Sequence, residues 1–140
     1  MKNINEELLE AVFNKNISKI EKLLKQGANI NYIDSKRDNA LLISIRNNNF
    51  DMVKYLLENG ANPNPDFQTV YMLPLQEAID TSVQIVNYNL NIEKEPMDII
   101  KLLIEYGANI LQKNENGEDA YSFAKNYHIP AQKLFEKIIA

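Results

Sequence analysis

The sequence offers few groupings of residues that could carry out acid–base or metal chemistry. Carboxylates stand close together at Glu77 and Asp80, and again at Glu93, Glu95 and Asp98. Hydrolytic acid–base catalysis needs two carboxyl groups that face each other in environments that separate their pKa values. A spacing of three residues on a helix places Glu77 and Asp80 on one surface, which favours a solvated face over a catalytic pair.

The other side chains that could form a catalytic or metal site are also isolated. His128 is the single histidine and there is no cysteine, which excludes thiolate sites and sites with two histidines. Four separate glycines form no phosphate-binding loop. His128 is expected in the turn between the last two helices, and a functional role beside Tyr127 and Lys125 is the alternative. The sequence therefore predicts no cofactor, no metal and no enzymatic activity.

The composition and charge of the chain argue against nucleic acids and membranes as binding partners. The chain has 140 residues, a net charge of −4 and an isoelectric point near 5.0, and its 15 Lys and Arg residues are dispersed. Binding to nucleic acid, which needs clustered basic residues, is not expected. No apolar run approaches the roughly 18 residues of a membrane span, and the N-terminus lacks the apolar core of a signal peptide. We therefore expect no membrane association and a cytoplasmic location.

The elements that would position a site are repeated along the chain. A closing motif recurs as GANIN at 27–31, GANPN at 60–64 and GANI at 107–110, with glycines 33 and 47 residues apart. Each motif follows a helical apolar period, and a shorter apolar segment precedes that helix. Glycine at the end of each run suits a left-handed helix C-terminus, and Pro96 and Pro130 suit first helical turns. The helices are expected at about 5–13, 17–26, 39–47, 50–59, 74–86, 96–105, 119–127 and 130–139.

This 33-residue helix–turn–helix period with a Gly-Ala-Asn-x-Asn ending resembles the ankyrin repeat. The opening motif Thr-Pro-Leu-His-x-Ala of that family is degenerate here and matches best at Leu73-Pro74-Leu75-Gln76-Glu77-Ala78. The resemblance implies an all-α solenoid with short β-hairpin-like connections. It also implies a single domain at 1–140 with four repeats at about 3–33, 34–66, 67–113 and 114–140.

The third repeat is longer than the family pattern. Most of its 14 additional residues fall at about 80–95, between the two helices of the repeat, and they include Val83, Ile85 and Tyr88. Two interpretations remain open. The first helix is lengthened, with its apolar residues packed on adjacent repeats, or the insertion is an exposed finger that adds binding surface.

The resemblance implies a protein-binding module that uses its concave face, formed by hairpin tips and the inner surface of each first helix. Phe67 and Tyr71 either project there or fold back onto the hairpin stem. The partner is another protein, and the chain is expected to be monomeric. Alternatives are a bacterial immunity-type or antitoxin-type inhibitor of a toxin or enzyme, a regulatory adaptor and, least favoured, an enzyme. The predicted binding residues are Lys36, Asp38, Arg46, Asn47, Phe67, Gln68, Tyr71, Asp80, Thr81, Tyr88, Glu115 and Glu118, with Ser35 and Asn126 beside them.

Overall fold

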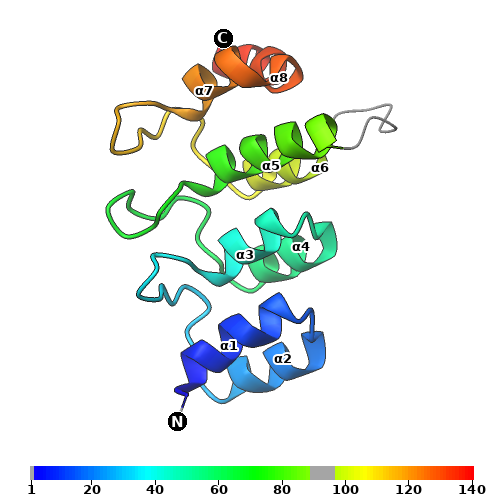
Figure 1. Ribbon diagram of the computed structural model, residues 1–140, viewed down its shortest axis with the longest axis vertical. Coiled ribbons are helices and arrows are strands. Elements are labelled where there is room, and N and C mark those ends of the chain that lie inside the picture. Colours follow the sequence, from blue (N-terminus) through cyan, green and yellow to red (C-terminus); the bar gives the residue numbers. More distant parts are fainter. Residues whose placement is uncertain (1, 89–96) are drawn as a thin grey trace.

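The described part of the chain forms a stack of helix pairs. The computed structural model describes residues 2–88 and 97–140, without the side chains of 86–88. Within these ranges there are eight α-helices and no strand (Figure 1). The helices are α1 (Ile4–Phe13), α2 (Ile17–Lys25), α3 (Ala40–Arg46), α4 (Phe50–Glu58), α5 (Pro74–Tyr88), α6 (Asp98–Glu105), α7 (Ala120–Tyr127) and α8 (Ile129–Ile139).

The eight helices predicted from the apolar period are confirmed, and their ends agree to within two residues. Pro130 lies in the first turn of α8, as expected. The predicted start of α6 at Pro96 lies outside the described residues, and α6 itself begins at Asp98. None of the helices in the described ranges has both the length and the apolar content to cross a bilayer.

Polar caps determine where most of the helices begin. Asparagine precedes α1, α2, α3 and α4, at Asn3, Asn16, Asn39 and Asn49, and each side chain accepts a hydrogen bond from a backbone N–H in the first turn. Asp119 does the same for α7. These side chains satisfy donors that a helix leaves unpaired at its start. Some of the 20 asparagines in the sequence therefore have a structural role.

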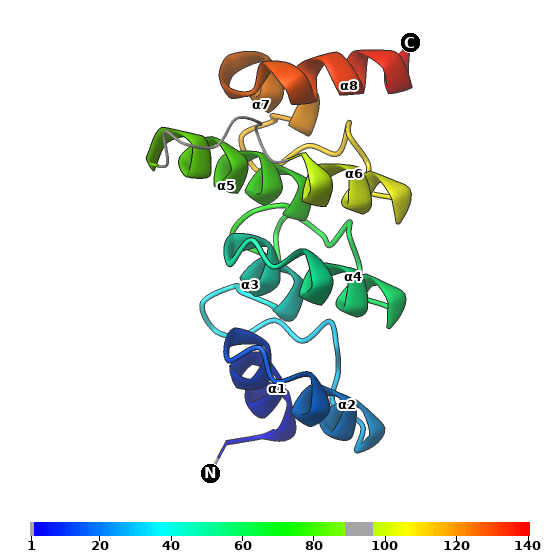
Figure 2. The same ribbon diagram turned by 90° about the vertical axis from the view of Figure 1, so that its right-hand side faces the viewer.

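The helices form two layers around one continuous core. The first helices α1, α3, α5 and α7 contact one another in sequence, and the second helices form a second layer beside them (Figure 2). The core extends from Leu8 in α1 to Phe135 in α8, both fully buried. Each helix pair therefore buries its apolar side against the next pair, as expected for a solenoid.

The closing motif has a specific role between repeats. The side chain of Asn31 donates to the carbonyl of Gly60 (3.1 Å) and accepts from the N–H of Asn62 (2.8 Å). Asn64 makes the same pair of contacts with Gly107 (2.8 Å) and Asn109 (2.7 Å). Each last asparagine of a motif therefore holds the motif of the following repeat.

The third repeat differs in its first helix. α5 has 15 residues, whereas α1, α3 and α7 have 10, 7 and 8. It continues through residues 80–88 of the predicted insertion, with Ser82 buried and Val83 and Ile85 half-buried. Residues 89–96 lie outside the described residues, so the exposed-finger interpretation remains untested there.

Candidate functional site

The candidate site lies on one side of the stack. We call this side the first-helix face: the surface of α1, α3, α5 and α7 together with the connections 27–39, 60–73 and 107–119, which begin after the C-caps of the second helices (Figure 1). Asp38, Phe67, Gln68 and the 114–118 turn lie in those connections, and Arg46 ends α3. The predicted binding residues thus come from several repeats but belong to one layer.

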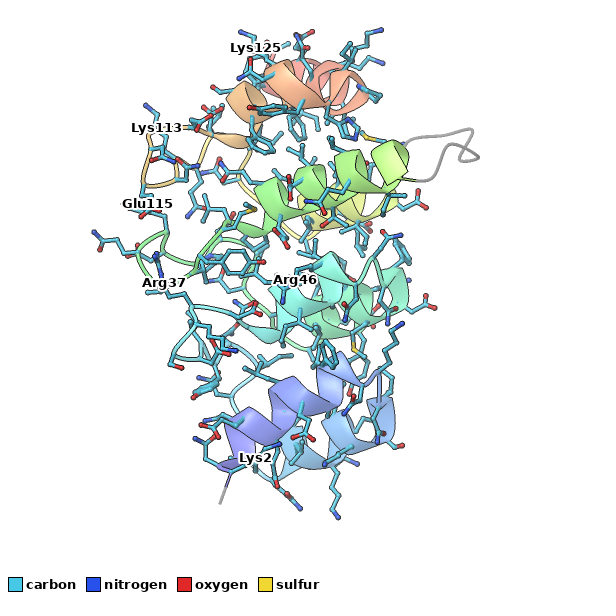
Figure 3. The ribbon with its side chains drawn as sticks, in the orientation of Figure 1. Lys2, Arg37, Arg46, Lys113, Glu115 and Lys125 are labelled. Atoms are coloured by element: carbon cyan, nitrogen blue, oxygen red, sulfur yellow. The ribbon has the colours of Figure 1, made fainter. Side chains whose placement is uncertain are left out.

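A polar network joins the second and third repeats. The Arg46 guanidinium donates to a carboxylate oxygen of Asp38 (Nη2 to Oδ2, 2.6 Å) and to the hydroxyl of Tyr71. Its centre lies 5.6 Å from the centroid of the Tyr71 ring. The Tyr71 hydroxyl donates to Glu77 Oε1 (2.9 Å), and Arg46 Nη1 lies 3.7 Å from the same oxygen. The network holds Arg46 and Tyr71 in fixed positions on the first-helix face, where Figure 3 labels Arg46.

The prediction that Glu77 lies on a solvated helical face is wrong. Glu77 is buried, with 4% of its surface exposed, because it lies beneath Tyr71 and Arg46. Burial raises the pKa of this carboxyl, and the Tyr71 hydrogen bond and the Arg46 charge oppose the change only in part. Burial and the nearby Glu77 carboxyl also raise the pKa of Tyr71, which stays a hydrogen-bond donor at neutral pH.

A second arginine fastens the connection that precedes α5. Arg37 Nη2 donates to the backbone carbonyls of Phe67 (3.1 Å), Gln68 (3.2 Å) and Val70 (2.8 Å). The Arg37 carbonyl in turn accepts from the N–H of Tyr71 (3.0 Å). Sequence reasoning did not single out Arg37, since no local pattern links it to residues 30 positions away.

Phe67 folds back onto the connection, which is one of the two orientations that the sequence left open. It is half-buried and packs on a small apolar cluster of Leu42, Val70 and Leu73 under the connection. Tyr71 is the more accessible of the two aromatics, with 38% of its surface exposed. The ring of Tyr71 is therefore the aromatic surface that this connection presents.

The junction between the third and fourth repeats contains a hollow of about 190 Å³. Buried Gln76 donates to the carbonyl of Glu118 (3.0 Å) and accepts from Asn114 (3.3 Å), which anchors the 114–118 turn to α5. The walls of the hollow come from the 66–73 connection, from the 114–118 turn and from α7, and they include Phe67, Tyr71, Met72, Phe123, Glu115 and Glu118. Figure 3 shows Glu115 at the end of that turn nearest the 66–73 connection.

The remaining predicted residues are more scattered. Lys36, Asn47 and Gln68 are exposed, and their side chains make no hydrogen bond within the described residues. Asp80 accepts from Gln84 (2.7 Å), and Thr81 is half-buried. Tyr88 ends α5, but its side chain lies outside the described part. The structure therefore does not bring all of the predicted residues into one cluster.

His128 caps a helix, in the turn where it was expected. Its Nδ1 accepts from the N–H of Ala131 (3.1 Å), and its Nε2 lies 2.9 Å from the hydroxyl of Ser82. In a neutral imidazole whose Nδ1 accepts, the ring proton lies on Nε2, which is then the donor to the Ser82 hydroxyl. His128 is 2% exposed and Ser82 is 3% exposed, so this pair is an internal contact between α5 and α8.

The described residues contain no candidate metal site. No group of three or more His, Asp or Glu side chains there has the geometry to hold a metal ion. Glu93 and Glu95 lie outside the described residues, and Asp98 is exposed.

Comparison with known proteins adds one finding. A family model described as ankyrin repeats, in three copies, matches residues 8–114. No curated protein matches the chain.

Proposed function

The chain belongs to the ankyrin-repeat family, and from this premise we propose that it is a binding module that holds a partner protein on its first-helix face. Ankyrin repeats generally mediate protein–protein interaction, and the family is typically not enzymatic. The finer parts of the proposal are the face that is used and the kind of partner.

The observation that carries the proposal is the fixed polar network at Arg46. Asp38 contacts one terminal nitrogen of this guanidinium, and Tyr71 and Glu77 lie beside the other, although the Arg46 side chain is 42% exposed. A partner that contacts these groups meets side chains already in place, so less conformational entropy is lost on binding. Tyrosine and arginine also contribute a large share of the energy in protein interfaces.

A finer version of the proposal is an inhibitor of a toxin or enzyme. The net charge of −4 favours a basic target, and Glu115 and Glu118 form no ion pair within the described residues. An adaptor would instead bind two proteins on separate surfaces. Identification of one basic partner would favour inhibition, and two partners that bind simultaneously would favour the adaptor.

Affinity capture from a lysate of the source cell, read by mass spectrometry, tests the proposal. The face variant carries Lys36→Glu and Gln68→Lys, two exposed changes in neighbouring connections of the first-helix face. The control carries Lys54→Glu and Gln26→Lys, the same chemical changes at exposed positions of the second-helix layer. We expect the wild type and the control to retain a stoichiometric partner that the face variant loses.

The control variant carries the same changes of charge as the face variant, so a difference between them depends only on where the changes lie. A partner that both variants retain equally would place the binding surface elsewhere on the molecule. The absence of any partner at stoichiometric yield would contradict the proposed function. Far-ultraviolet circular dichroism of both variants checks that the helices remain intact.

A further inference from the structure

We propose that the hollow between the 66–73 connection and the 114–118 turn is a subsite for an arginine side chain of the partner protein. This inference rests on the proposed function and specifies the chemistry of one contact on the first-helix face. It is carried by the shape, lining and charge of the hollow, and by the way in which the chain holds its own arginine beside it.

Part of the lining of the hollow is apolar and aromatic. Phe67, Tyr71 and Phe123 line it together with Met72, and these side chains are half-buried or exposed. An aromatic face attracts a cation placed over it, and a half-open site increases this attraction because water is partly excluded. Such a wall also accepts the methylene groups of a long side chain.

The rim of the hollow carries negative charge that the described residues leave unpaired. Glu115 is exposed and Glu118 is half-exposed, and both line the hollow. Lys2, Arg46 and their partners account for every ion pair within the described residues, so neither glutamate belongs to one. A cation from a partner is the group that complements this rim.

The neighbouring network shows how this surface accommodates a guanidinium. Arg46 lies over the ring of Tyr71, at 5.6 Å from its centroid, and contacts the carboxylates of Asp38 and Glu77. The hollow offers the same combination, aromatic rings with two carboxylates, and Tyr71 borders both sites. The second site differs in having no arginine of its own in the described residues.

Arginine fits this combination better than lysine does. A planar guanidinium can stack on an aromatic ring and still donate in two directions to carboxylates. The ammonium group of lysine is compact and strongly hydrated, and it loses more hydration when it enters an aromatic hollow. We therefore expect the hollow to distinguish the two cations.

The test uses the full chain and three small probes. The N-acetyl, N-methylamide derivatives of arginine, lysine and citrulline are titrated to millimolar concentrations, and binding is followed by nuclear magnetic resonance. Citrulline keeps the shape of arginine but removes its charge. We expect the arginine derivative to shift the ring resonances of Phe123 and Tyr71, and to bind about tenfold more tightly than the citrulline derivative.

Two double variants test whether the carboxylates of the rim are responsible for arginine binding. Glu115→Gln with Glu118→Gln should reduce arginine binding to the level of citrulline, whereas Glu58→Gln with Glu105→Gln, both exposed on second helices, should not change it. Equal binding of arginine and citrulline, equal binding of arginine and lysine, or no ring shifts at all would each overturn the subsite. Binding that the rim variant leaves unchanged would overturn it as well.

The two proposals can fail independently. A partner that is captured through the first-helix face while the probes fail to discriminate would leave the proposed function in place and remove the arginine subsite. Probes that discriminate while no partner is captured would support the subsite and contradict the proposed function.

Discussion

Two junctions of the stack consist of the same kinds of element, first helices and connections between repeats. They differ in whether their carboxylates have an ion pair. Between the second and third repeats, Arg46 neutralises Asp38 and approaches Glu77. Between the third and fourth repeats, a neutral side chain, Gln76, holds the turn, and the carboxylates of Glu115 and Glu118 have no ion pair in the described residues. Within the described residues, the carboxylates of the first junction therefore lie beside an arginine, whereas those of the second junction have no ion pair.

This difference suggests that the two junctions contribute differently to partner binding: one provides rigidity and the other provides selective recognition. A charge that is already paired offers the partner a contact whose position is fixed in the free protein, so less conformational entropy is lost on binding. An unpaired carboxylate on a hollow rim gains a partner only on binding. We therefore assign the first junction mainly to pre-organisation and the second mainly to selective contact.

Removal of Arg37 should have the largest effect on stability at the first junction. Arg37→Ala deletes the three hydrogen bonds that hold the 66–71 backbone, and should lower the free energy of unfolding by about 2–4 kcal/mol. The measurement is urea denaturation. Arg37→Lys keeps the charge and should recover only part of the loss, because an ammonium lacks the planar fork. A change below about 0.5 kcal/mol for Arg37→Ala would contradict the role of this residue.

The corresponding change at the second junction should cost less. Gln76→Met keeps the volume but removes both hydrogen bonds to the 114–118 turn, and should lower the free energy of unfolding by about 1–2 kcal/mol. Amide hydrogen exchange should accelerate in residues 114–118 and stay unchanged in residues 66–71. Acceleration in both turns would mean that the two junctions are not independent.

The buried carboxylate predicts a pH dependence specific to the first junction. The pKa of Glu77 in the folded protein is raised above its ordinary value of 4.5. Between these two values the folded state binds more protons than the unfolded state, so this group makes stability fall as pH rises through that window. Glu77→Gln should remove this component. Melting temperatures of both proteins should therefore differ in slope from pH 4.5 upward, and parallel curves would contradict the prediction.

The smallest effect on stability is expected at the rim of the hollow. Glu115→Gln with Glu118→Gln should change the free energy of unfolding by no more than about 0.5 kcal/mol, since neither carboxylate has an internal ion pair to lose. Thermal or urea unfolding measures this. A larger loss would show that the two glutamates serve the fold, and the contrast between the junctions would disappear.

The repeat, the helices and the apolar core can be predicted from the amino-acid sequence alone. Apolar periodicity identifies the buried side of each helix. Gly27 and Gly60 follow the C-caps of α2 and α4 and have φ angles of 97° and 96°. This left-handed conformation ends a helix, and glycine adopts it without strain. These are local properties, so they can be read within about ten residues. The candidate site was predicted only as a set of positions in the connections and first helices.

Which polar residues are buried and which remain accessible depends on how the repeats pack on one another. Glu77 and Asp80 look alike in sequence, but Tyr71 and Arg46 cover the first and leave the second half-exposed. Arg37 finds its acceptors 30 to 33 residues further along the chain. The environment of a polar side chain depends on the neighbouring repeat, and a helical period contains no information about which distant side chains that repeat will present.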